Sequence, residues 1–238
     1  MADKQGVERY AESAAFLRFT HEMKSRLFSE RSWRQVQNHE SEGLLGEIFN
    51  DGSAEAFVDK MLHNDCQTRL AEHLLPSVDR MSMAHSLETR SPFLDRRVAE
   101  FVMRIPAAWK LKHRRMKYVL RKHGERYLPL ALISRQKQGF GFPLGLWFRS
   151  DLRMLIENLC RNSRLAEAGI FRREEMLRLA QEHIGREMDH HMRLWMLFNL
   201  EIWYRHYMDG ETIESLEAWT KAARERSARE PHAERSPA

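Results

Sequence analysis

The stretch HSLETRSPFLDRR, residues 85–97, predicts the end of one helix, a short extended link and the start of another helix. Pro92 disfavours helical backbone at the residue before it, so Ser91 should be extended. Asp95 can accept hydrogen bonds from the free N–H groups of a first helical turn, which makes it a candidate N-cap. Glu88 follows a helix end, where the helix dipole does not favour an anion, so another group should hold it.

Helices are predicted on both sides of this link. Pro76 suits the first position of a helix that reaches about Ser86. After the link, apolar residues recur at i, i+3, i+4 and i+7 and predict one apolar helical face, formed by Val98, Phe101, Val102 and Ile105. Pro106 should end that helix.

Helical periodicity dominates the rest of the chain, and strand-like alternation is nearly absent. The stretch HHMRLWMLFNLEIWYRHYM, residues 190–208, is apolar on most sides and predicts a largely buried helix. Residues 224–238 are poor in apolar side chains and predict a disordered tail. The other helices are expected near residues 8–30, 38–50, 54–75, 115–127, 150–161, 172–185 and from 210 to about 222. The predicted fold class is therefore mainly α.

A second unusual stretch, SRQKQGFGFPLGLWFRSDL, spans residues 134–152. Gly139 and Gly141 alternate with Phe140 and Phe142 and are followed by Pro143. Glycines between aromatic residues predict a loop that its rings pin to the core and whose backbone can approach a ligand closely.

Composition narrows the class of protein. Hydrophobic residues make up 42% of the 238 and charged residues 31%, enough for a buried core with a polar surface. No apolar run approaches the roughly 18 residues that span a bilayer, and the N-terminus has no apolar signal region. Cys66 and Cys160 form no disulfide framework, so a cytoplasmic protein is expected. The net charge of +5 fits an arginine-rich surface better than a nucleic-acid-binding module.

Common cofactor motifs are absent. The sequence has no glycine-rich nucleotide fingerprint and no nucleophile elbow. His190 and His191 are adjacent, so on a helix they point about 100° apart and cannot easily share one metal ion. His183 and Cys66 have no partners at ligand spacing, so we predict no metal site from this chain's own residues.

Five ionisable residues remain as candidates. Asp79 and Arg80 lie in the middle of a predicted helix, where an ion pair or a charged helix face is an alternative to a role in a site. Glu88 and Arg90 lie on the link, and Glu88 could be held by a nearby arginine or could act in an active site. Lys137 precedes the glycine-containing loop, where an ammonium could stabilise an oxyanion or a phosphate.

Three stretches together resemble the glutamine-dependent asparagine synthetases. They are LLPSVDRMSMAHSLETRSPFLDRRVAEFVMRIPAAWKLK (74–112), KYVLRKHGERYLPLALISRQKQGFGFPLGLWFR (117–149) and the tryptophan-containing stretch 190–208. The resemblance covers roughly residues 8–210. It implies that residues 1–210 are the C-terminal part of a synthetase domain and that 211–238 form a terminal helix and a tail.

The family resemblance also implies a fold and a reaction. The synthetase domain of these enzymes is an α/β ATP-pyrophosphatase domain, of which this chain would be the helical C-terminal portion. It uses ATP and Mg²⁺ to adenylate aspartate, and ammonia released from glutamine then displaces AMP. Nucleic acid and membrane are not expected partners.

Site roles follow by position. Glu88 matches the glutamate of the family's E-x-R-x-P-F-L-D motif and would act as a general base or orienting group. Lys137 matches the lysine before the Gly-rich loop and would stabilise charge on the acyl-adenylate. The positions expected to support them or bind substrate are Asp79, Arg80, Arg90, Asp95, Gly139 and Gly141. The link would then aim Glu88 into a cleft it shares with Lys137, with Pro92, Phe93 and Leu94 locking the link to the core.

The sequence also departs from the family. Met1 is followed by Ala2 rather than the glutaminase cysteine, and the Ser-Gly-Gly-x-Asp-Ser and Gly-Glu-Gly-x-Asp-Glu segments are missing. The chain could be a ligase half that needs a polypeptide carrying the missing part. It could instead be an inactive remnant or a helical interaction module. Exposed apolar patches where a sheet should pack would favour the first two alternatives.

Overall fold

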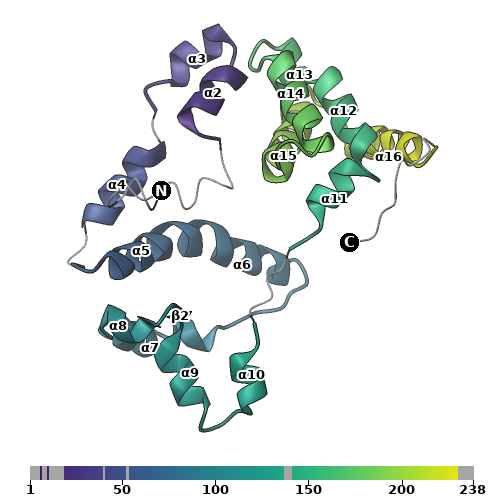
Figure 1. Ribbon diagram of the computed structural model, residues 1–238. Helices are drawn as coiled ribbons and strands as arrows, with labels where there is room; N and C mark the ends of the chain where they lie inside the picture. Colours follow the sequence, from purple (N-terminus) through teal and green to yellow (C-terminus); the bar gives the residue numbers. More distant parts are fainter. Residues whose placement is uncertain are drawn as a thin grey trace. The chain divides into compact units, whose positions relative to one another are not determined.

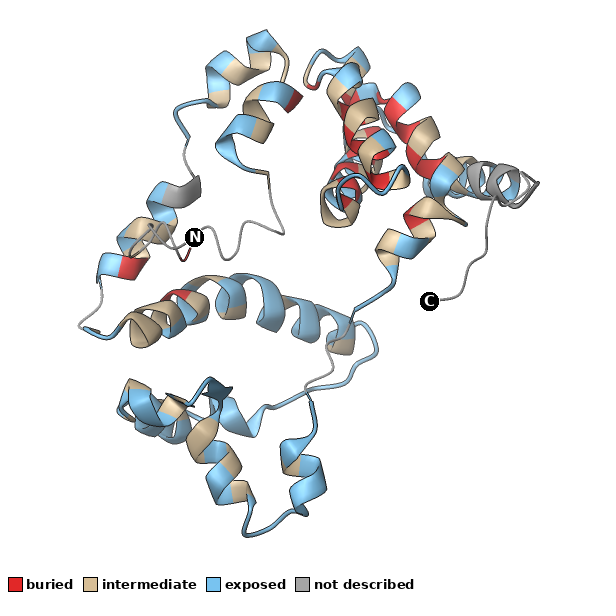
Figure 2. Cartoon of the chain, in the orientation of Figure 1, coloured by how far each residue is buried: buried red, intermediate tan, exposed pale blue. Residues whose placement is uncertain are grey.

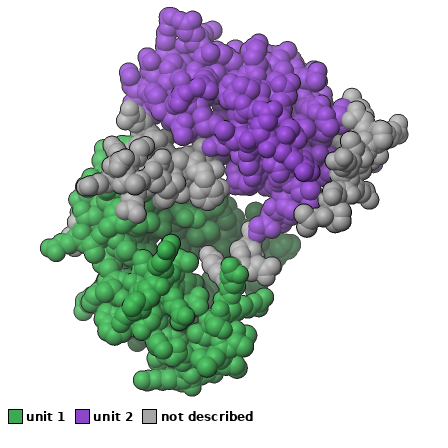
Figure 3. All heavy atoms as spheres, viewed as in Figure 1, with its two compact units in different colours: residues 1–11, 41–139 green, residues 12–40, 140–238 purple. Residues whose placement is uncertain are grey.

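The computed structural model describes residues 6, 10, 19–39, 41–51, 54–136 and 141–229. It divides into two compact units (Figures 1 and 3). Unit 1 comprises residues 1–11 and 41–139, and unit 2 comprises residues 12–40 and 140–238. The described part of the chain is mainly helical, which confirms the predicted mainly α character. None of the described helices is both long and apolar enough to span a membrane.

A long helical rod is the main feature of unit 1. It runs through α5 (Phe57–Asp65), the π-helix η1 (Cys66–Leu74) and α6 (Leu75–Met83), and Figure 1 shows it as one curved helix. Pro76 lies in the first turn of α6, as predicted, but no gap separates α6 from the helix before it. The Leu75 N–H donates to the carbonyl of Leu70, five residues back, which is the hydrogen-bond spacing of a π-helix. The rod therefore continues without a break as far as Pro76, which has no N–H to donate.

The remaining elements of unit 1 are short. Residues 111–116 form a two-stranded antiparallel hairpin, and the helix predicted near 115–127 begins only after it, at Tyr118. The short elements of unit 1 are α4 (Ser41–Asp51), η2 (Pro92–Leu94), α7 (Arg96–Met103), α8 (Ala107–Lys110), β1 (Leu111–Lys112), β2 (Arg115–Met116), α9 (Tyr118–Gly124) and α10 (Leu130–Ser134).

Burial in unit 1 is concentrated where α4 meets α5. Asn64 is buried, and its Nδ2 donates to the carbonyl oxygen of Leu45 at 2.7 Å. The Tyr10 hydroxyl donates to Asp65 Oδ1 at 2.8 Å, and the pKa of Tyr10 is raised to about 12, first by burial and then by this carboxylate. The ring of Phe49 packs against Tyr10, with 5.9 Å between ring centroids.

The apolar side chains of α6 and α7 are largely exposed (Figure 2). The face predicted on α7 exists as a helix, but 67% of Phe101 is accessible to solvent. Phe93 and Leu94 are exposed as well, so the prediction that they lock the link to a core is wrong for unit 1. The reason is that α6 packs mainly on its own continuation η1, and α7 mainly on η2.

Unit 2 holds the hydrophobic core, which Figure 2 shows as buried positions gathered in α12 to α15. Its helices are α2 (His21–Leu27), α3 (Glu30–Val36), α11 (Leu144–Arg149), α12 (Arg153–Arg161), α13 (Arg164–Glu167), α14 (Arg173–Ile184), α15 (His191–Tyr207) and α16 (Ile213–Arg229). The core consists of Leu27, Phe148, Ile156, Leu159, Cys160, Leu165, Phe171, Met176, Leu179, Ala180, Leu194 and Leu197. Burial raises the pKa of the Cys160 thiol to about 12, so this cysteine is an inert core residue.

Several helix boundaries in unit 2 differ from those predicted. The helix expected over 8–30 is interrupted at Phe28, which forms a β-bridge with Phe171, and α3 begins after the Ser29 N-cap. The stretch expected as a loop contains α11. Helix α16 continues to Arg229, so the first part of the predicted disordered tail is helical. Residues 230–238 lie outside the described part of the chain.

Helix α15 is less buried than its composition predicts. One stripe, formed by Leu194, Leu197, Glu201 and Arg205, is buried against the neighbouring helices. The opposite stripe stays accessible, and 48% of Trp203 is exposed. Because unit 2 covers only one side of α15, the prediction of a largely buried helix is wrong for this unit.

The buried Glu201 carboxylate connects α15 to α13. It accepts hydrogen bonds from the Ser163 hydroxyl at 2.7 Å, from the backbone N–H of Arg164 at 2.7 Å and from that of Leu165 at 3.3 Å. The Arg205 guanidinium completes the set at 2.8 Å. A fully buried charge is costly unless it is paired and hydrogen-bonded, and these contacts meet that requirement.

Replacing Glu201 with Leu should lower the free energy of unfolding of unit 2 by about 3–5 kcal/mol, because Arg205 and the first turn of α13 lose their acceptor. Urea denaturation followed by circular dichroism measures this change. Glu167→Gln is the matched control, because Glu167 pairs with a half-exposed Arg164 and should contribute less than about 1 kcal/mol. Equal effects of the two substitutions would contradict the role assigned to Glu201.

A second set of buried polar contacts in unit 2 is centred on His183. Its Nδ1 accepts the His190 N–H at 3.2 Å, so the ring proton is on Nε2 and can be donated to the Gly145 carbonyl, also at 3.2 Å. Burial lowers the pKa of His183, and the Arg149 guanidinium lowers it further, whereas Asp189 opposes the shift. Neutral His183 therefore belongs to the folded state.

The lowered pKa of His183 predicts that unit 2 loses stability as the pH falls below the ordinary histidine value of about 6.5. In that range the unfolded chain binds the proton more readily than the folded chain, so the free energy of unfolding falls by up to about 1.4 kcal/mol per pH unit. Urea midpoints between pH 7.5 and 5 measure the slope. His183→Gln should flatten it, whereas His21→Gln, at an exposed position, should not. An unchanged slope in His183→Gln would refute the assignment.

Candidate active site in unit 1

The link between α6 and α7 has the local form that the sequence predicts. Ser91 is extended, with φ −94° and ψ 118°, and Pro92 opens the single turn of η2. Asp95 caps α7, because its Oδ1 accepts the backbone N–H groups of Arg97 at 3.0 Å and Val98 at 3.4 Å. Local signals therefore set the path of the chain through the whole motif.

Glu88 and Arg90 are bound to each other. The Arg90 Nε donates a hydrogen bond to Glu88 Oε1 at 2.8 Å, and Arg90 Nη2 forms an ion pair with the same oxygen at 2.5 Å. Both side chains are exposed, at 67% for Glu88 and 88% for Arg90. Arg90 is thus the group that holds the carboxylate after the helix end. An ion pair this exposed adds little to the stability of the fold.

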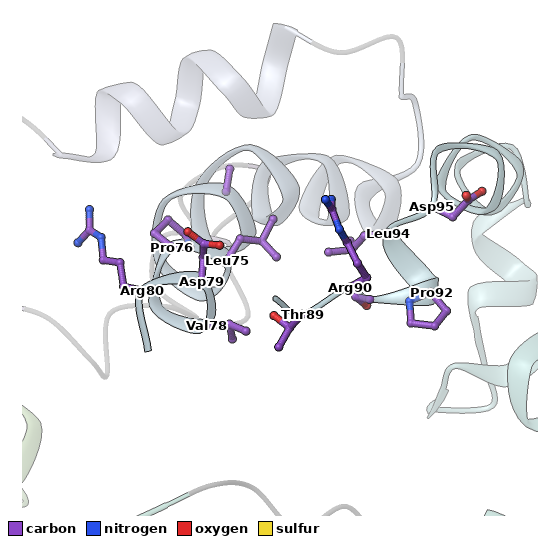
Figure 4. A pocket seen from close by; sticks show the side chains of 12 residues that line it. Leu75, Pro76, Val78, Asp79, Arg80, Thr89, Arg90, Pro92, Leu94 and Asp95 are labelled. Carbon is purple, nitrogen blue, oxygen red and sulfur yellow. The ribbon is translucent and has the colours of Figure 1, made fainter. Parts of the chain in front are cut away.

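A pocket of about 880 Å³ lies beside this link (Figure 4). It brings together four residues predicted from the sequence, namely Asp79, Arg80, Arg90 and Asp95. In Figure 4, Arg80 and Asp95 lie at opposite sides of the view, with Asp79 and Arg90 between them. Its other lining residues are Ala71, Leu75, Pro76, Val78, Thr89, Ser91, Pro92 and Leu94. Thr89 was not among the sequence candidates, although it separates Glu88 from Arg90 in the motif.

Not all predicted residues meet in this pocket. Glu88 lies next to it through Arg90 but is not one of the residues that line it. Lys137 and Gly139 lie outside the described residues, so their expected meeting with Glu88 remains a prediction. Among the described residues, no atom lies within 4 Å of the place where a side chain at Gly141 would begin, so none of them requires a glycine there on steric grounds.

The aromatic residues of the loop behave differently from the prediction. Phe142 is 75% exposed and contacts only the ring of Trp147 at 6.3 Å among the ring contacts of the described residues. The expectation that Phe142 pins the loop to the core is therefore wrong. Phe140 lies outside the described residues.

The pocket joins two cationic and two acidic side chains on one surface. Asp79 and Arg80 form no ion pair with any described residue, so they are charged positions of a helix face rather than partners of each other. Guanidinium groups in such a position can bind carboxylate or phosphate oxygens. Free carboxylates can accept hydrogen bonds from an ammonium or a ribose hydroxyl.

The residues that line the pocket suit the phosphates of ATP better than they suit a metal ion. Arg80 and Arg90 are the residue types that bind the phosphates of ATP. Within the described ranges, no three histidine, cysteine or acidic side chains cluster closely enough to hold a metal ion. The described pocket therefore supplies no metal cage of its own, although Mg²⁺ needs only one or two protein carboxylates when phosphates complete its shell.

Comparison with known proteins identifies the family. Residues 3–205 match the family model described as asparagine synthase. The chain belongs to the asparagine synthase family. The match includes every residue of the pocket and the complete link.

Two curated relatives show how far the similarity extends. Asparagine synthetase [glutamine-hydrolyzing] 1 of Bacillus subtilis is 29% identical over 185 residues, which are 76% of this chain and 29% of the relative. A putative asparagine synthetase of Mycobacterium bovis is 31% identical over 160 residues, 67% of this chain and 24% of that relative. The chain therefore spans less than a third of the length of these asparagine synthetases. No solved structure matches significantly.

Asp95→Ala should lower the free energy of unfolding of unit 1 by about 1 kcal/mol, because the first turn of α7 loses its acceptor. Urea denaturation monitored by circular dichroism measures the loss. Asp95→Asn keeps the cap and should stay within a few tenths of a kcal/mol of the parent chain. If alanine costs no more than asparagine, Asp95 has a role other than capping.

Proposed function

We propose that this chain contributes the helical part of an asparagine synthetase-type ligase site, in which ATP activates an acid such as aspartate and ammonia forms the amide. The observation that carries the proposal is the pocket at the family motif, lined by Asp79, Arg80, Arg90 and Asp95. Pairs of opposite charges suit a substrate that carries both a carboxylate and an ammonium group.

Glu88 would serve the amide-forming step. Ammonia attacks the activated acyl carbon, AMP leaves, and a proton must be removed from the nitrogen. A carboxylate can accept that proton. The hydrogen bond and ion pair with Arg90 hold the Glu88 carboxylate in place, which supports this assignment. Asp95, occupied in capping α7, would act as a positioning residue for the link.

The cations would serve the activation step. Negative charge develops on the α-phosphate when the acid attacks ATP, and a fixed cation in the site lowers the energy of that state. Arg80 is available for this task, because it forms no ion pair among the described residues. Lys137 takes the same role by its place in the family pattern, with Gly139 and Gly141 letting the backbone come close to the substrate.

The exposed surface of unit 1 supports a need for further polypeptide. Large apolar side chains of α6 and α7 are open to solvent, including Val78, Met81, Phe101 and Val102. Exposed apolar area on this scale marks an interaction site. We propose that a polypeptide bearing the phosphate-binding part of an α/β ATP-pyrophosphatase domain covers these helices. Ammonia would come from glutamine, and the cytoplasm is the expected compartment.

Pyrophosphate release tests this proposal. The chain is mixed with aspartate, ATP, Mg²⁺ and ammonia, alone and together with a polypeptide that carries the phosphate-binding half of an asparagine synthetase domain. We expect pyrophosphate and asparagine only from the pair. Binding of the two polypeptides without any product would instead favour a helical interaction module, and failure to bind would favour an inactive remnant.

In an active pair, Glu88→Gln and Lys137→Ala should each reduce the rate by about 100-fold or more, because they remove a proton acceptor and a charge-stabilising cation. Glu100→Gln is the matched control, since Glu100 also forms an exposed ion pair, with Arg96. The control should retain its rate, and all three variants should unfold within about 1 kcal/mol of the parent chain. Full activity of either site variant removes that residue from the mechanism.

A further inference from the structure

Positive charge is concentrated in one segment of unit 1. Residues 104–126 contain nine lysines and arginines and a single acid, Glu125, although the whole chain has a net charge of only +5. The rest of the chain therefore carries more acids than bases. Clustered like charges repel one another and destabilise a fold unless an anion neutralises them.

A hairpin at the centre of this segment directs some of these charges outward. The strands pair Leu111 with Met116 and Lys112 with Arg115, which leaves a two-residue turn at His113 and Arg114. Both turn residues have left-handed backbone, with φ 51° and 61°. Such turns normally use Asn-Gly, and a side chain at a left-handed position costs about 1 kcal/mol or more. Lys117 is left-handed as well, with φ 58°.

Two cations at the base of the hairpin are already engaged. Lys110 Nζ lies 2.7 Å from Asp59 Oδ1. Lys112 Nζ lies 4.9 Å from the ring centroid of Trp109 and 5.2 Å from that of Tyr118. These contacts fix the base, and they cover one face of each ring with an ammonium group.

The outer cations are free to bind a partner. Arg114, Arg115 and Lys117 are exposed and form no ion pair with any acid in the described part of the chain. Apolar side chains lie among them, with Met116 63% exposed and Leu111 and Leu120 also open to solvent. We name the set formed by Leu111, Arg114, Arg115, Met116, Lys117 and Leu120 the basic hairpin face.

We propose that the basic hairpin face docks an acidic polypeptide segment in which apolar side chains alternate with glutamates or aspartates. In β2 the side chains of Arg115 and Met116 point to opposite sides of the hairpin, and a segment extended along β2 whose acidic and apolar side chains also alternate would meet each of them with the matching type of side chain. Nucleic acid is the weaker match, because stacking of bases needs open aromatic faces, and Lys112 occupies one face of both nearby rings. This interaction does not depend on the ligase activity.

Fluorescence anisotropy with a labelled peptide of alternating glutamate and leucine, titrated with the intact chain at low salt, tests the proposal. We expect saturable binding that weakens as salt is added. R114E/R115E should weaken it by about tenfold or more, since like charges then oppose the peptide. R31E/R34E, at exposed arginines of α3 in unit 2, makes the same change in net charge and should alter the affinity less than about threefold.

Further variants separate the contribution of the positive charges from that of the apolar contacts. R114Q/R115Q removes the charges without reversing them and should also weaken binding, while M116S should weaken the glutamate–leucine peptide but leave a leucine-free glutamate peptide unaffected. Circular dichroism should show that every variant keeps its helical signal. The proposal is overturned by absence of binding at low salt or by equal loss in R31E/R34E. It is also overturned if single-stranded DNA or anionic phosphatidylserine vesicles bind the hairpin more tightly than the peptide does.

Discussion

The packing of unit 2 depends on one buried carboxylate. Glu201 lies on α15 and accepts hydrogen bonds from Ser163 and from the first turn of α13, while Arg205 from its own helix balances its charge. Helix α13 has only four residues and would be marginal by itself. With its free N–H groups satisfied, it places Leu165 in the core and leads the chain to Phe171, where the segment containing Phe28 is attached.

Unit 1 is organised on a different physical basis. It lacks a core comparable to that of unit 2 among its described residues, and its helices display apolar side chains to solvent. Local signals nevertheless hold the motif in shape: Pro76 in the first turn of α6, the extended Ser91 before Pro92, and the Asp95 cap. A pocket built from residues 71–95 can therefore form without long-range packing, whereas a working ligase would require the exposed helices to be covered.

Unit 1 has two kinds of exposed surface, one apolar and one basic, and each is expected to make a different kind of interaction. The apolar faces of α6 and α7 suit a stable, buried interface, because removing apolar area from water is what would stabilise binding there. The basic hairpin face is charged and local, so its contacts should respond to salt and exchange more readily. A family member with both features can combine a constitutive partner with a transient one.

Much of the candidate site could be predicted from sequence because its determinants lie within 25 residues of one another. The resemblance to the family had already marked Asp79, Arg80, Arg90 and Asp95 as supporting or substrate-binding positions, and all four line one pocket. The exposure of Phe93 could not be predicted, because apolar composition does not reveal whether a partner element is present to cover it. The relation of Glu88 to Lys137 also depends on contacts far apart in the chain.

The sequence alone determined the helical class, the Asp95 cap, the asparagine synthase family and the charge pattern, because each follows from side chains within a few turns of one another or from a family motif. Tertiary structure decided which faces are buried. It interrupted the first helix at Phe28 through the bridge to Phe171, and it joined Glu201 to a helix start 37 residues earlier. Such pairings depend on which distant segments meet, and local propensity carries no information about that choice.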